Sequence, residues 1–136
     1  MPWYGFIHPL LAIGTFAYGV ALGQTSMSKL NDWNFPLRRQ RYRSIVFFLL
    51  CAANFVVGLV ASAVMRGTGH GVKITGHMPL AVVALIFSVI GTLVTFARAK
   101  PGELSGTMRL HPVIIIIALA SILTMGFLSI MALFGA

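Results

Sequence analysis

The sequence predicts an all-α integral membrane protein, a four-helix bundle with up-down topology formed by one domain, residues 1–136. Hydrophobic residues make up 58% of the chain and charged residues only 9%. A soluble domain is typically about a quarter charged, so this composition excludes an ordinary water-soluble globule. The charged residues also lie between apolar segments, and each such segment is near the ~20 residues that span a bilayer.

Four apolar segments are the predicted spans. No Asp, Glu, Lys or Arg lies inside any of them. Helices are expected because a helix satisfies its own backbone hydrogen bonds in lipid, whereas a barrel needs alternating polarity and more strands than this length supplies. The predicted spans run from Trp3 to Leu22, Ser44 to Met65, His77 to Ala97 and Leu110 to Phe134.

The distribution of basic residues predicts the orientation. The formal charge is +8, which in a soluble protein would suggest nucleic acid, but here the basic residues fall in loops and no nucleic-acid partner is expected. The positive-inside rule places the first and third loops in the cytoplasm, and both termini on the periplasmic side of a bacterial inner membrane. Those two loops hold Lys29, Arg38, Arg39, Arg41, Arg43, Arg98, Lys100 and Arg109, against Arg66 and Lys73 in the second loop.

The histidines point to a cofactor. His8 and His77 begin the first and third predicted spans from the same side of the membrane, so their imidazoles are expected at similar depth. The first and third helices of an up-down bundle can face each other diagonally across its core. Two neutral imidazoles that face each other can hold a haem iron at both axial positions. The sequence thus predicts a haem b site with His8 and His77 as the metal ligands.

Other residues suit a large apolar macrocycle with anionic propionates. Arg66 and Lys73 lie on the side of the membrane where the propionates would be. Small residues would let helix backbones approach the ring, although in membrane spans they also serve tight helix packing. The glycines predicted to give this room are Gly14, Gly19, Gly23, Gly58, Gly91 and Gly126.

The remaining histidines leave alternatives open. His111 begins the fourth span from the cytoplasmic side, so it cannot share the iron of the first pair. Three interpretations of it carry equal weight: a ligand of a second haem, a hydrogen-bond donor to a quinone, or an interfacial residue without a ligand. For the second haem, candidate partners are Gln24, Met27, Tyr42 and Met108. His70, in a glycine-rich run, is predicted to be an exposed loop residue and is the reserve ligand should His77 not serve.

Polar residues inside the spans are expected to hydrogen-bond across helices or to the carbonyl four residues earlier. The single cysteine, Cys51, excludes a disulfide framework within the chain and a multi-cysteine metal site. The basic run at residues 38–43 is predicted to anchor the topology, with docking of an acidic partner subunit as its alternative. The span residues in question are Asn54, Ser62, Ser88, Thr92 and Thr95.

Four short motifs carry a family resemblance: HPLLAIG at residues 8–14, RRQRYR at 38–43, GH at 76–77 and RLH at 109–111. With them the chain resembles the small four-helix bacterial membrane proteins related to cytochrome b561, over nearly its whole length. The resemblance implies b-type haem held between paired histidines, with His8 and His77 as the outer pair and His111 as half of an inner pair. The chain departs from the family at Ser44, near which the partner of His111 would be expected.

Two functions follow as hypotheses. The first is a membrane-embedded b-type cytochrome subunit that transfers electrons between a quinone pool and a redox partner, an electron-transfer subunit rather than a complete enzyme. The alternative is a non-redox anchor or assembly subunit of a respiratory or photosynthetic complex that binds quinone, lipid or a chlorophyll-type pigment. A transporter is disfavoured because the spans hold no charged group for coupling ions. Expected partners are membrane lipid, quinone, and other membrane subunits or further copies of the chain.

Overall fold

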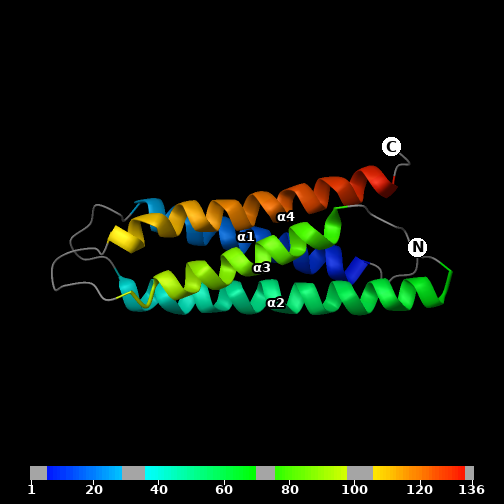
Figure 1. Ribbon diagram of the computed structural model, residues 1–136, viewed down its shortest axis with the longest axis horizontal. Helices are drawn as coiled ribbons and strands as arrows, with labels where there is room; N and C mark the ends of the chain where they lie inside the picture. Colours follow the sequence, from blue (N-terminus) through cyan, green and yellow to red (C-terminus); the bar gives the residue numbers. More distant parts are fainter. Residues whose placement is uncertain (1–5, 29–35, 70–75, 98–105, 134–136) are drawn as a thin grey trace.

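The chain folds into long antiparallel helices. The computed structural model describes residues 6–28, 36–69, 76–97 and 106–133, and in these ranges it contains helices and no strand. The helices are α1 (Ile7–Ser28), α2 (Leu37–Gly67), α3 (His77–Val94) and α4 (His111–Leu133), with the short 3₁₀ helix η2 (Gly106–Leu110) leading into α4 (Figure 1). All four α-helices are long and apolar enough to cross a membrane, which confirms the predicted all-α membrane bundle.

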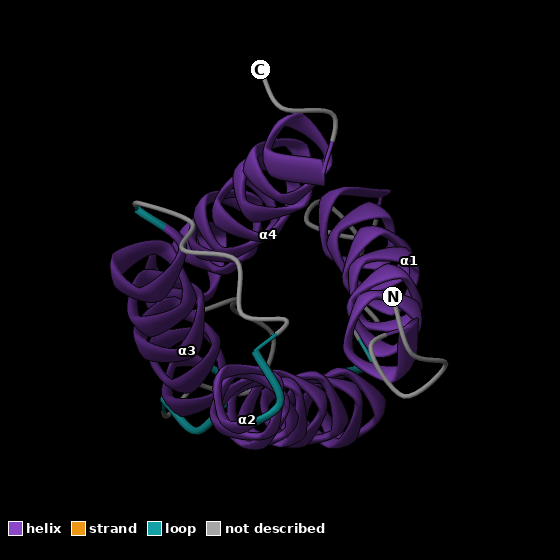
Figure 2. Cartoon of the chain, turned by 90° about the vertical axis from the view of Figure 1, so that its right-hand side faces the viewer, coloured by secondary structure: helices purple, strands orange, loops and turns teal. Residues whose placement is uncertain are grey.

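The helices form a closed ring (Figure 2). Both α1 and α3 pack against α2 and against α4, so α1 and α3 lie diagonally opposite each other, as predicted. Because neighbouring helices run in opposite directions, α1 and α3 begin at the same end of the bundle, at the right in Figure 1. We call this the His8 end, and the opposite end, where α2 and α4 begin, the His111 end.

The first two helices differ from their predicted bounds at the His111 end. Helix α1 continues past Leu22, the predicted end of its span, to Ser28. The hydroxyl of Thr25 donates to the carbonyl of Ala21 at 2.8 Å, and that of Ser26 to the carbonyl of Leu22 at 3.1 Å, so these polar residues continue the helix. Trp3, the predicted start, lies outside the described residues.

Helix α2 begins at Leu37, ahead of the basic run, rather than at Ser44. Its 31 residues extend about 46 Å, more than the ~30 Å of bilayer hydrocarbon. Two of the basic side chains contact neighbouring parts of the bundle. The Arg41 guanidinium donates to the Thr95 carbonyl at 3.0 and 3.2 Å and lies 4.3 Å from the centre of the Phe96 ring, and Arg43 donates to the Thr25 hydroxyl at 2.7 Å. These contacts explain why the helix continues through charged residues.

The third and fourth helices begin almost where predicted. Helix α3 starts at His77 and ends at Val94, and a hydrogen-bonded turn over residues 95–97 completes the predicted span. Helix α4 starts at His111, one residue after the predicted start, because Leu110 belongs to η2. The predicted end at Phe134 lies outside the described residues.

The tightest packing lies in the half of the bundle toward the His111 end. Phe47 and Leu22 are fully buried there with Ile115. The ring of Phe47 fits against Gly19, where an added Cβ would lie 2.5 Å from a ring carbon. The rest of this core cluster comprises Cys51, Ala84, Ala118 and Ile122.

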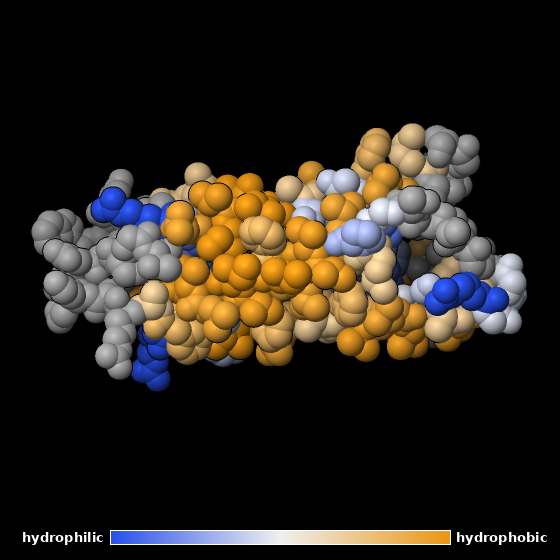
Figure 3. Space-filling view, in the orientation of Figure 1, coloured by the Kyte–Doolittle hydropathy of each residue, from blue (hydrophilic) through white to orange (hydrophobic). Residues whose placement is uncertain are grey.

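The surface of the bundle is apolar around its circumference. Large hydrophobic side chains on all four helices are exposed, among them Leu10, Val60, Leu93 and Leu123. Figure 3 shows a hydrophobic band along the face in view, with hydrophilic residues gathered toward the ends. Such a surface suits contact with lipid acyl chains, so the chain is a multi-pass membrane protein.

Candidate cofactor site between the first and third helices

His8 and His77 meet inside the bundle. Each lies at the start of its helix, and each is followed within two residues by a proline, whose missing N–H costs nothing in a first helical turn. The centres of the two imidazole rings are 6.0 Å apart, and the ring planes make an angle of 64°. The structure therefore brings together the two residues that the sequence proposed as a pair, from diagonally opposite helices.

Gly58 of α2 makes room for the His8 ring. A Cβ at Gly58 would lie 2.9 Å from Cε1 of His8 and 3.3 Å from both of its ring nitrogens. The imidazole thus lies directly against the backbone of α2. Any larger residue at Gly58 would push His8 from this position, which gives one of the predicted small residues a specific role.

The other five predicted glycines differ in what they contact, and an added Cβ at Gly23 would make ordinary contact with Ile115 at 3.7 Å. Gly19 and Gly91 receive side chains, since an added Cβ at Gly91 would lie 3.0 Å from Ile115. By contrast, an added Cβ at Gly14 or Gly126 would meet nothing within 4 Å.

The ring nitrogens of His8 and His77 differ in their hydrogen-bond partners. Nδ1 of His77 lies 3.4 Å from the hydroxyl of Ser129, and this hydroxyl donates its proton to the Met125 carbonyl at 2.8 Å. The Ser129 oxygen can therefore only accept from His77, which places the His77 proton on Nδ1. Nδ1 of His8 is buried and has no hydrogen-bond partner among the described residues.

His111 has a different environment. It is fully buried, and its two ring nitrogens lie 2.9 Å from the hydroxyls of Ser26 and Ser44. Gln40, also buried, donates to the Ser26 hydroxyl, and Thr92 donates to the Ser44 carbonyl at 3.0 Å. The network joins all four helices. To bind a metal or a quinone, His111 would have to release one of its serines.

Three of the four candidate partners of His111 are exposed. Met27 and Tyr42 are 59% and 69% exposed, and Gln24 is exposed as well. Met108 is buried at the same end of the bundle. His111 as a ligand therefore stays a prediction, and its hydrogen bonds to two serines describe a structural residue.

The predicted propionate partners lie apart from the histidine pair or outside the described residues. Arg66 is exposed, and its Nε donates to the Ser62 carbonyl at 3.2 Å. It lies eight residues beyond Gly58, which is about 12 Å along the helix axis. Lys73 and His70 lie outside the described residues.

The polar residues of the spans behave largely as predicted. Asn54 bonds across to Thr15 of α1 at 3.2 Å, and Thr92 bonds across to α2. The hydroxyls of Ser88 and Thr95 donate to carbonyls three residues earlier in the chain. For Asn54 the sequence left open a bond across helices or one to the carbonyl four residues earlier, and the structure shows the bond across helices. Asn54 lies one helical turn before Gly58, against which the His8 ring packs.

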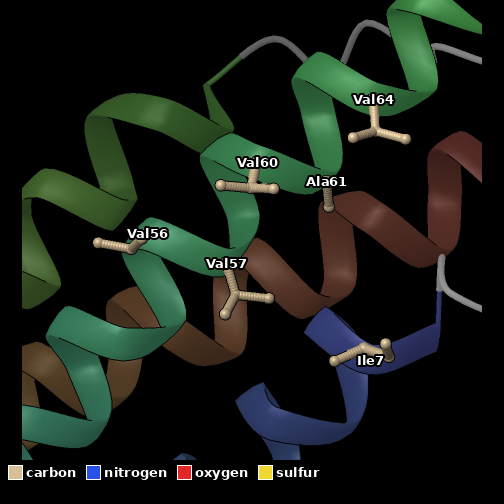
Figure 4. A pocket seen from close by; sticks show the side chains of 6 residues that line it. All are labelled: Ile7, Val56, Val57, Val60, Ala61 and Val64. Atoms are coloured by element: carbon tan, nitrogen blue, oxygen red, sulfur yellow. The ribbon is translucent and has the colours of Figure 1, made fainter.

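An apolar groove of about 290 Å³ lies between α1 and α2 at the His8 end (Figure 4). Ile7 and Val57 of its lining are next in sequence to His8 and Gly58, but neither His8 nor His77 lines the groove. It offers an apolar surface at the same end of the bundle as the histidine pair. The lining residues are Ile7, Val56, Val57, Val60, Ala61 and Val64.

Comparison of the chain with protein-family models, with curated proteins and with solved structures gave no match. Among the described residues, no group of three or more His, Cys, Asp or Glu side chains could hold a metal ion. The His8–His77 pair offers two imidazole ligands.

Proposed function

We propose that the chain is a membrane-embedded b-type cytochrome subunit, which transfers electrons between a quinone pool and a redox partner through a haem held by His8 and His77. The observation that carries this proposal is the pair of imidazoles from diagonal helices, with ring centres 6.0 Å apart. The resemblance to cytochrome b561 relatives, whose motifs include the same two histidines, led to the same proposal.

The spacing of the rings fits two ligands on one iron. An imidazole nitrogen binds a transition metal at about 2 Å, so two imidazoles on opposite sides of one ion have ring centres about 6 Å apart. Axial ligation leaves the angle between the two ring planes free, so 64° is compatible with it. The buried Nδ1 of His8 and the bare backbone at Gly58 also fit a ring that must turn to meet a ligand.

The chain's own contribution is ligation in an apolar setting. The haem, when bound, supplies the one-electron redox chemistry. His8 and His77 would provide neutral imidazole ligands, and Ser129 would orient His77 by accepting from its Nδ1. The groove beside His8 presents apolar side chains, and such a shell lowers the local dielectric and so tunes the redox potential.

Further parts of the proposal rest on the sequence. The distribution of basic residues supports a bacterial inner membrane location with periplasmic termini. Arg66 and Lys73 are proposed to neutralise the propionates, and His111 to serve the fold rather than a second haem or a quinone. Lipid, quinone and further membrane subunits or copies of the chain are the proposed partners.

A reduced-minus-oxidised absorption spectrum with pyridine haemochrome quantitation tests the proposal. We expect a low-spin b-type spectrum at about one haem per chain. His8→Ala and His77→Ala should each abolish it, and His70→Ala is the matched control that should leave it intact. A full low-spin spectrum in both single variants, or no haem in protein made with ample haem supply, would contradict the proposal.

The apolar groove favours one second candidate, a non-redox anchor subunit of a respiratory or photosynthetic complex. Its six aliphatic lining residues suit an isoprenoid or acyl tail beside His8. A chlorophyll-type pigment needs a single imidazole for its magnesium, so His77→Ala would leave pigment binding in place. Pigment or quinone retained without haem in the purified protein would favour this candidate.

A further inference from the structure

Two buried side-chain atoms near the histidine pair have no hydrogen-bond partner among the described residues: Nδ1 of His8 and Oδ1 of Asn54. They belong to neighbouring helices. Asn54 precedes Gly58 by one turn of α2, and the His8 ring lies against Gly58. Asn54 and His8 therefore lie close together where α1 and α2 meet. A buried polar atom without a hydrogen bond costs free energy inside a membrane. Nδ1 of His8 can donate a proton and Oδ1 of Asn54 can accept one, so each atom could satisfy the other.

The hydrogen bonds of Thr15 determine which way the Asn54 amide faces. The hydroxyl of Thr15, fully buried, donates to the Leu11 carbonyl at 2.8 Å, so its oxygen can only accept from a second partner. Asn54 Nδ2 donates to that oxygen at 3.2 Å. A flipped amide would set two acceptors against each other. The amide oxygen of Asn54 is therefore the atom left for His8.

An acceptor beside His8 selects one form of its imidazole. A neutral imidazole carries a single N–H, and the other nitrogen holds a lone pair. Since Oδ1 of Asn54 can only accept, the favoured form has the proton on Nδ1 and the lone pair on Nε2. Outer partners of metal-binding histidines commonly act in this way, by accepting from the nitrogen that does not bind the metal.

We propose that Asn54, oriented by Thr15, is a positioning residue that holds His8 with its proton on Nδ1 and so presents Nε2 as the ligand atom. Ser129 does the same for His77 from α4. The choice of tautomer stands without a cofactor, while the role of Nε2 as a ligand rests on the proposed haem site.

The first test reads the tautomer directly. Long-range ¹H–¹⁵N correlation spectra of the histidines, recorded on full-length protein from haem-deficient cells, should show His8 protonated at Nδ1. Free neutral histidine favours the proton on Nε2. Asn54→Leu, which removes the acceptor, should therefore move the proton to Nε2, and Thr15→Val should give a mixture of forms. His8 protonated at Nε2 in the unaltered protein would overturn the proposal, even if haem binds.

The second test uses the haem-loaded protein. Asn54→Leu should weaken haem binding by about 10- to 100-fold and raise the midpoint potential, because the His8 imidazole becomes a weaker donor. Asn54→Asp, a stronger acceptor, should lower the potential. Thr124→Val is the matched control, since Thr124 is exposed and donates to the carbonyl four residues earlier, as Thr15 does. Unchanged affinity and potential in Asn54→Leu would overturn the proposal.

The two tests separate failure of the positioning role from failure of the proposed function. If the unaltered protein binds no haem, the proposed function fails, and the tautomer of His8 still decides the role of Asn54. If haem binds and the Asn54 variants behave as the control does, only the positioning role fails. Helicity measured by circular dichroism shows whether each variant is folded.

Discussion

The two ends of the bundle treat their histidines in opposite ways. At the His111 end, His111 is fully buried and both ring nitrogens have serine partners at 2.9 Å. At the His8 end, two imidazoles lie close together, and Nδ1 of His8 has no partner among the described residues. A buried polar group that the chain satisfies by itself supports the fold. One that the chain does not satisfy indicates where a ligand or a rearrangement belongs.

The two ends also differ in how many of their side chains are buried. Most buried residues of α2 and α3 lie in the halves of these helices toward the His111 end, and the exceptions, Asn54 and Ala84, lie close to the middle of their helices. Asn54, the last buried residue of α2, marks the boundary. The His111 end therefore holds more of the buried side chains that pack the bundle together.

The largest expected effect is on haem content, which should depend on His8 at one end and not on His111 at the other. His8→Ala should remove the haem completely while changing the unfolding temperature of the haem-free protein little. His111→Ala should retain the haem. Haem content per chain, measured for both variants, checks this expectation. Loss of haem in His111→Ala, with His8→Ala unaffected, would reverse the assignment of the two ends.

The next effect is the stability of the His111 end. His111→Ala leaves the buried hydroxyl of Ser44 without its partner, which costs about 1–3 kcal/mol, while Ser26 keeps Leu22 and Gln40. The lost ring also leaves a cavity, which adds to this cost. We expect a loss of about 2–4 kcal/mol in the free energy of unfolding in micelles. His77→Ala, at the other end, is the control and should lose less. Equal losses would show that the ends do not differ in this way.

Adding a methyl group at a glycine sharpens the comparison. At Gly19 the new Cβ would meet Phe47 at 2.5 Å and Leu119 at 2.6 Å, so Gly19→Ala should destabilise the protein by about 1–3 kcal/mol. At Gly58 the methyl would displace His8 instead. Gly58→Ala should therefore lower the affinity for haem more than it lowers the free energy of unfolding. Gly14→Ala, where nothing lies within 4 Å, is the control for both. Similar behaviour of all three variants would contradict the assigned contacts.

The smallest effect concerns the arginines where α2 begins. Arg41 donates to the last turn of α3 and stacks on Phe96. Arg41→Ala should therefore cost about 1 kcal/mol of stability. Arg38→Ala, which removes an exposed side chain, should cost less than about 0.5 kcal/mol. Unfolding by denaturant in micelles compares the two variants. Equal losses would show that the contacts of Arg41 do not stabilise this end of the bundle.

Much of the site could be predicted because it depends on span order alone. The starts of the first and third spans must lie at the same side of a membrane, so His8 and His77 were expected at one depth. The interhelical role of Asn54 also followed from its polarity inside a span. The extension of α2 through residues 38–43 was not predicted, because its charges end an apolar run and find their partners only on α1 and α3.

The contacts of His111 and the orientation of Asn54 could not be predicted in this way. They depend on how each helix is rotated about its own axis, and helices that are apolar nearly all round give little periodicity from which to predict that rotation. Nothing in the sequence distinguishes Ser44 as the partner of His111 from a serine that faces lipid. Ser26 and Gln40 are equally ordinary until α1 and α2 pack together.

The sequence by itself determined the class of protein, the number of spans and the end of the bundle at which each histidine lies. The physical reason is that the bilayer demands about 20 apolar residues per helix and places charges outside them. Only the tertiary structure decided that His111 is satisfied by two serines, that His8 lies on Gly58, and that the amide nitrogen of Asn54 bonds to Thr15. Those outcomes depend on helix rotation and side-chain packing, which local sequence does not encode.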